Sequence, residues 1–463
     1  MRPIFKNGST RARAMAWIVW LCFAGMMAGL GFMTRPWSRM EMILLPVFGL
    51  GTWLILVRRR PRKIPVLNYH SVSASPEWLQ IADQVSLTPE AFERQLAYLE
   101  RHEYRTLFAS EVYQALSGKI RLRSRGRYVA LTLDDGYADN WVAAFPLLRK
   151  YGMKATLFVS PGFVGEAPGC RPTIEQNDGA KGGGLDWSGY LTWPELKAMQ
   201  ASGLVEIQSH GEAHTRVFVE PELKGFVGPG KSNLWMFWNA LPERRTQWWH
   251  KLGEDRSLWG QPVFRQGPAL AHRAYQPAPD AMASFLSWVG EAGAAIFDRP
   301  NWEARLREEW QRRTGDPAKQ GKLEEPEVYV RRIMEDLGRA RETLERKLRT
   351  KVEVLCWPEN AFSPEGEAAA RRLGYKATVS NRHHSRNVAG EAPDLIVRTF
   401  IGCRAAGIRS SWLDFAAFVL ELKVFEGWYL VYPFLAVMHQ ARTWGLALRR
   451  HCLCRRDYVS IWA

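Results

Sequence analysis

The chain has 463 residues, 46% of them hydrophobic, and its length predicts two to four domains. Its net charge of +16 would suit nucleic acid or an anionic membrane surface. The sequence shows no zinc-finger spacing, no aromatic RNA-binding motif and no long basic helix, so we expect no nucleic-acid partner. The six cysteines are scattered and form neither a disulfide framework nor a zinc-ribbon pattern.

Two uncharged apolar runs near the N-terminus predict a membrane anchor over residues 1–63. Residues 14–33 are long enough to cross the hydrocarbon core as a helix. Residues 42–57 form a shorter run, which is marginal for a second transmembrane helix. A signal peptide is the competing interpretation of the first run, but no small-residue cleavage site precedes the second run. We therefore expect membrane lipids among the partners of this chain.

The basic residues that flank these runs predict how the anchor is oriented. Lys and Arg are denser before the first run and after the second run than in the link between them. The positive-inside rule then predicts a hairpin of two spans in the cell inner membrane, with the body of the chain in the cytoplasm. If only the first run crosses, the body faces outward and the basic cluster at 58–63 breaks the rule.

From residue 64 onward, short apolar strands alternate with helices. We expect helices to begin after Thr88, which precedes Pro89, and after Thr192, where Glu195 completes a capping box. This alternation predicts an α/β fold with a parallel sheet, open or closed into a barrel. The expected strands lie at 64–70, 128–133, 155–159, 204–208, 352–357 and 376–380.

Two other segments depart from this rhythm. Residues 216–326 are rich in tryptophan and predict a mainly helical insertion between two parts of the sheet-forming body, 64–215 and 327–405. Residues 406–463 form an apolar and aromatic C-terminal extension. Its charged residues make it too polar for a clean span, so it predicts a helix that is buried in the body or lies at a membrane interface.

Polar residues follow several of the expected strands. Asp134 and Asp135 end the stretch "VALTLDD", and "SHGEAH" places His210 and His214 four residues apart. Two imidazoles on one face and one carboxylate form a ligand set that suits catalytic zinc. The ion would relieve the repulsion between the adjacent aspartates, and the second carboxylate would stay free beside the bound water as a base. Each motif alone is common, and their shared position at strand ends supports the metal site.

The same stretches resemble the polysaccharide deacetylases with a NodB-homology domain, carbohydrate esterase family four. The resemblance rests on "LTLDDGYADN" with "ATLFV", and on "LTWPELKAMQASGLVEIQSHGEAH". The opening "VLNYHSV" is similar to the branch that contains the biofilm poly-N-acetylglucosamine deacetylases. The likeness covers residues 64–215 and resumes over 352–400 through "CWPENAFSPEGEAAARRLGYKATVS".

The resemblance implies a distorted (β/α) barrel that removes the N-acetyl group from an amino-sugar polysaccharide or glycolipid with a divalent ion, Zn²⁺ being the expected one. By motif it implies that Asp134 is the general base and His70 the general acid. It implies that the metal ligands are Asp135, His210 and His214.

The sequence also departs from the family pattern and leaves alternatives open. Pro358 is kept in "CWPENAF", but its surroundings differ from the usual third motif. The pair His383–His384 could supply the acid in place of His70. The tryptophans of 216–326 could pack a subdomain, stack on sugar rings or contact a membrane.

Two rival functions also remain open. The first is hydrolysis of some other amide. Release of acetate from N-acetylglucosamine oligomers would distinguish a polysaccharide deacetylase from this rival. The second is a membrane-bound glycan-binding protein with an inactive deacetylase-like domain. The presence of all four residues Asp134, Asp135, His210 and His214 argues against the second.

Overall fold

The computed structural model describes residues 63–453, except 80, 124–125, 177–183, 251–255, 316–320, 382–386 and 389–393. The two predicted membrane runs and the pair His383–His384 lie outside the described residues, as does the end of the C-terminal extension. Over the part of the chain that is described, no helix combines the length and the hydropathy that crossing a membrane requires.

A parallel sheet forms the centre of the body. Eight strands follow one another in the order β14, β13, β12, β7, β6, β5, β1 and β15. A ninth strand, β4 (Tyr104–Leu107), pairs with the beginning of β5. The strands of the main path are β1 (Val66–Tyr69), β5 (Arg127–Leu133), β6 (Ala155–Val159), β7 (Val205–Ser209), β12 (Val354–Cys356), β13 (Ala377–Ser380), β14 (Leu395–Val397) and β15 (Thr399–Phe400). The parallel α/β architecture that the sequence predicted is therefore confirmed.

The two ends of this strand path are joined by a single residue. β14 and β15 lie at opposite ends of the path, yet only Arg398 separates them in the chain. The sheet therefore curls round until its edges meet, which produces a nearly closed barrel. Asn387 also links the first and last parts of the barrel, because its side chain donates to the Ile64 carbonyl at 3.1 Å and accepts from the Val397 amide at 2.8 Å.

Helices cover the outside of this sheet, and their ends follow the predicted capping signals. In α4 (Pro89–Arg101), the Thr88 hydroxyl accepts a hydrogen bond from the Ala91 amide at 3.2 Å. In α7 (Trp193–Ala201), Thr192 and Glu195 form the predicted capping box. The core between sheet and helices contains a large apolar cluster, in which Leu96, Leu131 and Leu157 have 0% exposure.

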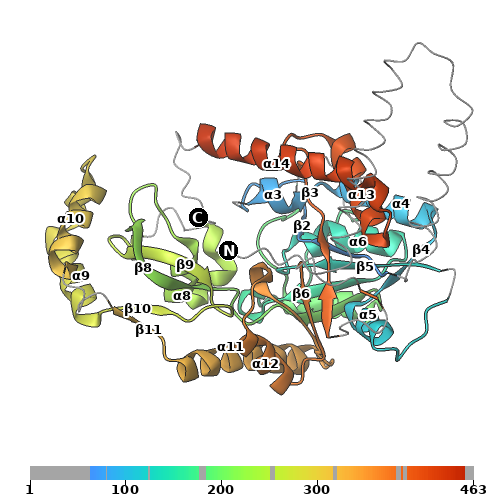
Figure 1. Ribbon diagram of the computed structural model, residues 1–463, viewed down its shortest axis with the longest axis horizontal. Coiled ribbons are helices and arrows are strands. Elements are labelled where there is room, and N and C mark those ends of the chain that lie inside the picture. The colour runs from blue at the N-terminus through green and yellow to red at the C-terminus, as the bar shows by residue number, and fades with distance from the viewer. Residues whose placement is uncertain are drawn as a thin grey trace, which may run out of the picture.

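Residues 216–326 form a separate lobe beside the barrel (Figure 1). The lobe is built on an antiparallel hairpin of β8 (Arg216–Phe226) and β9 (Pro262–Pro268), and on the short pair β10 (Tyr275–Pro277) and β11 (Gly321–Leu323). It also contains helices α8 (Leu234–Ala240), α9 (Pro279–Ala292) and α10 (Trp302–Thr314). The hairpin was not expected in a mainly helical insertion. Most of β8 is half-buried or exposed, so its sequence lacks the alternation that marks a strand.

Long helices join these parts and end the described chain. α11 (Pro326–Leu348) leads from the lobe back to the barrel, and the shorter α12 (Pro364–Arg372) connects β12 to β13. α13 (Ser411–Glu426) packs on α4, where the rings of Phe418 and Tyr98 lie 5.8 Å apart. α14 (Tyr432–Leu453) crosses the top of the barrel near the short helix α3 (Ala82–Val85) (Figure 1).

Candidate metal-dependent active site

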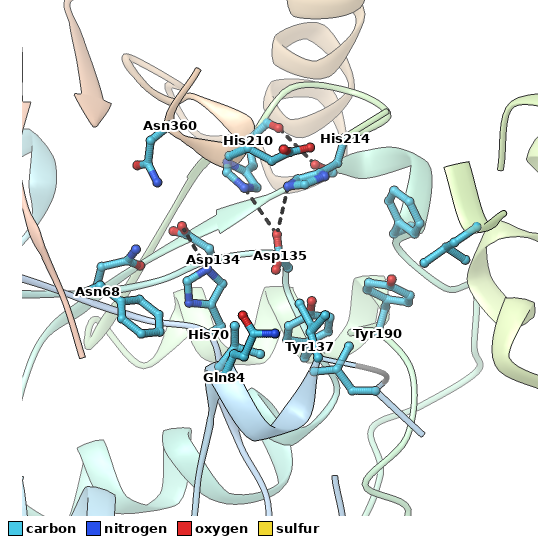
Figure 2. A pocket seen from close by; sticks show the side chains of 18 of the residues that line it. Asn68, His70, Gln84, Asp134, Asp135, Tyr137, Tyr190, His210, His214 and Asn360 are labelled. Atoms are coloured by element: carbon cyan, nitrogen blue, oxygen red, sulfur yellow. Dashed lines mark hydrogen bonds and ion pairs between the residues drawn. The ribbon is translucent and has the colours of Figure 1, made fainter. Parts of the chain in front are cut away.

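The C-terminal ends of the parallel strands bring all five predicted site residues together (Figure 2). His70 follows β1, Asp134 and Asp135 follow β5, and His210 follows β7. Because parallel strands present their carboxyl ends at the same edge of the sheet, these side chains converge on one pocket.

Asp135 lies between two histidines. Its Oδ1 atom is 3.3 Å from Nε2 of His210 and 3.5 Å from Nε2 of His214. The loops that bear these ligands have unusual backbones, because φ is +70° at Asp135 and +42° at His214. Left-handed backbone at residues other than glycine costs free energy and is concentrated at functional sites. The observed backbone strain therefore supports a functional role for this cluster.

The chemistry of these three side chains fits a divalent cation. One carboxylate oxygen and two imidazole nitrogens, all within 4.8 Å of one another, form a set that Zn²⁺ accepts. The ring of His210 is held in orientation because its Nδ1–H donates a hydrogen bond of 2.9 Å to the Cys356 carbonyl. This hydrogen bond leaves the Nε2 lone pair directed towards Asp135, as a metal ligand requires. Burial lowers the pKa of His214 to about 4, so its imidazole is neutral at pH 7.

The charges around His210 also favour a cation at this position. Burial alone would lower the pKa of His210, but Cys356, Asp135 and Asp134 outweigh burial and raise that pKa well above its ordinary value. A bound divalent ion would satisfy the same acidic surroundings in place of a proton.

Asp134 is held by an arginine that sequence reasoning missed. Arg398 donates two hydrogen bonds of 2.6 Å, one to each carboxylate oxygen, and both side chains are almost fully buried. Burial alone would raise the pKa of Asp134, but Arg398, His210 and His70 more than offset it and hold that pKa below its ordinary value. The carboxylate that was expected to stay free is therefore ionised and fixed in orientation.

His70 lies on the other side of Asp134 from the two metal-side histidines (Figure 2). Its Nε2 atom is 3.7 Å from Oδ2 of Asp134, and its buried Nδ1 atom has no hydrogen-bond partner within the described part of the chain. Burial lowers the pKa of His70, and the neighbouring aspartates offset this only in part. The imidazole is therefore neutral at pH 7 and is an acid of increased strength once it is protonated.

The pocket around these residues has two different walls and a volume of about 450 Å³. The barrel contributes a polar wall that contains the residues described above. The lobe and two nearby loops contribute an aromatic wall, in which the rings of His214 and Trp235 stack at 5.8 Å. The aromatic wall consists of Phe163, Tyr190, Leu234, Trp235, Trp238 and Trp248.

The altered third motif also contributes to the pocket. Glu359 and Asn360 both have positive φ, +53° and +56°, and both line the pocket. Glu359 pairs with Arg216 at 3.4 Å, and Asn360 accepts a hydrogen bond from Arg398 at 3.4 Å. The segment that departs from the family pattern thus connects the first strand of the lobe with the arginine that holds Asp134.

Comparison with known proteins assigns the centre of this site to a family. Residues 122–233 match the family model for polysaccharide deacetylase, and this segment contains Asp134, Asp135, His210 and His214. The match to the polysaccharide deacetylase domain therefore covers the metal-site residues and less than half of the chain. The family predicted from the motifs is confirmed for this segment, while the nearer likeness to the poly-N-acetylglucosamine branch stays a prediction.

Individual relatives resemble the chain in part. It is 34% identical over 155 residues to YxkH of Bacillus subtilis (strain 168), provisionally named a polysaccharide deacetylase. The aligned part covers 34% of this chain and 44% of that protein, so the chain spans less than half the length of this curated relative.

Solved structures also show a partial likeness. IcaB from Ammonifex degensii is 19% identical, with 78% of this chain and 97% of that one covered and a TM-score of 0.43. A de-N-acetylase from Aggregatibacter actinomycetemcomitans is 17% identical, with 73% of this chain and 95% of that one covered and a TM-score of 0.46. The BpsB deacetylase domain from Bordetella bronchiseptica is 17% identical, with 74% of this chain and 98% of that one covered and a TM-score of 0.45.

Proposed function

We propose that this protein is a metal-dependent N-deacetylase that hydrolyses the acetamido group of an amino-sugar glycan. The observation that carries the proposal is the juxtaposition of a cation-binding cluster, Asp135 with His210 and His214, and an ionised carboxylate, Asp134, in one pocket. The family match over this segment supports the same class of reaction.

Asp135, His210 and His214 would hold the ion, for which Zn²⁺ suits the ligand set. When bound, such an ion supplies Lewis-acid polarisation of the substrate carbonyl and lowers the pKa of water. All further steps fall to groups of the chain itself.

Asp134 acts as the general base in this proposal. Its carboxylate is ionised and aimed by Arg398, so it can accept a proton from the water that attacks the acetamido carbon. That proton can pass to Nε2 of His70, 3.7 Å away, and from there to the nitrogen that leaves. Acetate and a free amino sugar result, and both protein groups return to their starting state.

The aromatic wall suits a sugar ring. Sugars present apolar C–H faces that pack against aromatic rings, and their hydroxyls accept N–H donors. Trp238 contributes its ring to this wall, and its indole N–H is buried without a partner within the described residues. The opening motif supports an N-acetylglucosamine unit, as in the poly-N-acetylglucosamine branch.

The position in the cell is a further part of the proposal. The uncharged runs at 14–33 and 42–57, with their basic flanks, favour a two-span anchor and a cytoplasmic body. Reporters active only inside or only outside the cytoplasm, fused after Ala463, test this orientation. Activity of the external reporter alone would reverse it.

Metal analysis and acetate release test the central claim. The full chain should contain a divalent ion and release acetate from N-acetylglucosamine oligomers, and Asp135→Ala should lose both the ion and the activity. Asp394→Ala, which removes a surface carboxylate paired with Arg371, is the matched control and should keep both. A wild-type protein that binds the oligomers without releasing acetate would favour a glycan-binding protein instead.

The role of His70 needs a separate comparison. His70→Ala should keep the metal and should damage amide hydrolysis more than hydrolysis of activated esters, whose leaving groups need no proton. Equal damage to both substrates would remove His70 as the acid and would direct the search to His383 and His384.

A further inference from the structure

Exposed large apolar side chains gather on the C-terminal helices. Trp412 at the start of α13 is 71% exposed, and Trp444 in α14 is 64% exposed. Within the described part of the chain, the only exposed large apolar residues that lie away from these helices and their flanking loops are Leu323 and Val328. The exposed set on and around α13 and α14, which we call the C-terminal face, consists of Ile408, Trp412, Trp428, Leu430, Phe434, Val437 and Trp444. A concentration of this kind marks an interaction surface.

The place where the N-terminal apolar runs join the body identifies what this face meets. Lys63 is the first described residue, so the segment that contains both runs reaches the body there. Lys63 lies against Gly427, at the junction between α13 and α14, because a Cβ atom at Gly427 would come within 3.0 Å of its Nζ. A membrane segment that ends at residue 57, six residues before Lys63, would therefore bring the bilayer near the C-terminal face.

The charges near this face suit an anionic bilayer. The side chain of Arg409 is 79% exposed and pairs with Asp83 at 3.0 Å. The sequence beyond the described residues also contains Arg455 and Arg456. Each basic residue near an anionic membrane surface contributes about 1 kcal/mol. Tryptophan prefers the boundary between lipid and water, where its ring is apolar and its N–H remains hydrated.

No described helix is apolar and long enough to cross a bilayer. The charged residues of α13 are turned towards the body, where Glu421 accepts a hydrogen bond from Thr399 at 2.8 Å and Lys423 pairs with Glu426 at 3.1 Å. The exposed large apolar side chain of α13 is Trp412. The inner side of α14 is fixed to the body, because a Cβ atom at Gly445 would lie 2.8 Å from Cα of Gly407. Trp444 is adjacent to this close contact and remains exposed.

The same helix reaches the pocket. Arg442 of α14 lines it, with its guanidinium 5.3 Å from the centre of the Phe400 ring, and it donates to the Gln84 carbonyl at 3.5 Å. Arg442 and Trp444 are two residues apart, so they lie on opposite sides of α14, one towards the pocket and the other outward. A bilayer that covers Trp444 would therefore lie on the far side of the helix that forms this part of the pocket wall.

We propose that the C-terminal face rests on an anionic lipid bilayer and that the acetamido sugar is presented to the pocket on a membrane lipid. The second part rests on the proposed deacetylase function, whereas the contact with the bilayer is independent of it. The enzyme would then act on a glycolipid at the membrane surface.

Crosslinking to lipid tests the contact. The full chain is placed in vesicles of phosphatidylcholine and phosphatidylglycerol that contain a phospholipid with a photoactivatable acyl chain. After illumination, mass spectrometry should find lipid on peptides that contain Trp412 and on those that span Val437 to Trp444. It should find none on the peptide with Leu323 and Val328, which serve as exposed apolar controls. Labelling confined to residues 14–57 would overturn the proposal.

Activity on two substrates tests the presentation of the sugar. One substrate is N-acetylglucosamine on a long-chain alkyl phosphate in the same vesicles, and the other is a soluble N-acetylglucosamine oligomer. The combined change Trp412→Ser, Val437→Ser and Trp444→Ser should lower turnover of the lipid-linked substrate about tenfold or more, since lost apolar burial weakens membrane contact. Turnover of the soluble oligomer should stay unchanged.

The control variant is Leu323→Ser with Val328→Ser, which should change neither rate. An equal loss on both substrates in the triple variant would contradict presentation from the membrane. If the wild-type protein hydrolyses neither substrate, the deacetylase function and the glycolipid substrate fail together, while crosslinking still decides the contact with the bilayer.

Discussion

The two walls of the pocket differ in how their side chains are fixed. On the polar wall, Asp134 is held by two hydrogen bonds of 2.6 Å, and His210 is oriented by a carbonyl at 2.9 Å. On the aromatic wall, Trp238 is held by ring contacts, at 4.5 Å from Trp235 and 4.7 Å from Phe163. Hydrogen bonds fix direction, whereas ring packing fixes position and tolerates some change of shape. The difference indicates that the polar wall carries the chemistry and the aromatic wall carries binding.

The largest loss of activity should follow from removal of a metal ligand on the polar wall. His210→Ala removes one of three protein ligands, and activity should fall about a thousandfold or more, because a metal supplies several kcal/mol of transition-state stabilisation. Metal content by elemental analysis should fall with it, and a chelator should reproduce the loss in the wild-type protein. Full metal occupancy in His210→Ala would contradict the assignment.

Asp134→Asn should separate the base from the metal cluster. The carboxamide cannot accept the proton of water, so turnover should fall by roughly 10²–10⁴-fold while the metal stays bound. The measurement pairs acetate release with metal analysis of the same sample. Loss of the metal together with activity would instead make Asp134 a metal ligand. The alternative ligand cluster would then be Asp134, His210 and Cys356, which also lie close together.

Removal of Arg398 should show how much the polar wall depends on its buried ion pair. Arg398→Met leaves the Asp134 charge buried without its partner, so the free energy of unfolding should fall by about 3–5 kcal/mol. Adding Asp134→Asn should restore much of the stability and none of the activity. The control Arg371→Met breaks the exposed pair with Asp394 and should cost less than about 1 kcal/mol. Denaturant unfolding measures all of these variants.

A change in the aromatic wall should mainly affect binding. Trp238→Leu should raise KM for N-acetylglucosamine oligomers about tenfold with little change in kcat, because it removes uniform binding of the sugar. Trp310→Leu is the matched control, since Trp310 is buried to a similar degree in the separate core of the lobe. It should lower stability and leave KM unchanged, and a large fall in kcat for Trp238→Leu would contradict the division between the walls.

The smallest effect should be a dependence of stability on pH that comes from beneath the polar wall. Burial raises the pKa of Asp139 to about 7, although Ser71 and the Val72 amide donate hydrogen bonds to it. Between pH 4 and pH 7 the folded state therefore keeps a proton that the unfolded state has lost, so stability falls as pH rises through this range. The contribution to the slope should reach about 1.4 kcal/mol per pH unit.

Asp139→Asn tests this contribution. Asp139 accepts from three donors, Ser71, the Val72 amide and Asn140, and the amide of Asp139→Asn keeps one acceptor oxygen for them. Because this amide cannot ionise, the unfolding free energy of the variant should vary less between pH 5 and pH 6 than that of the wild-type protein. An unchanged profile would show that Asp139 does not titrate in this range.

The parts of the molecule that the sequence predicted well are those with short-range patterns. The strands, the capped helices at Thr88 and Thr192 and the pair His210 and His214 all depend on residues close together in the chain. Asp135 lies 75 residues before His210 and was placed with this pair because both follow expected strands. Arg398 could not be assigned in this way, because it lies 264 residues from Asp134. Its one signal is a lone charge inside the apolar stretch "LIVRTF". The hairpin of β8 and β9 was missed because its half-exposed strands lack an alternating pattern.

The position of Arg398 at the seam of the barrel has a consequence for the order in which the protein can fold during synthesis. Asp134 leaves the ribosome long before the residue that neutralises it. Until β14, Arg398 and β15 have been made, the barrel has no closing strand and the carboxylate lacks the arginine that donates to both of its oxygens. Domains generally fold as units once their sequence is complete, so the barrel should reach its final form only after nearly the whole chain has been translated. The nascent chain would therefore carry an open sheet edge for most of its synthesis, which makes early chaperone contact valuable to this protein.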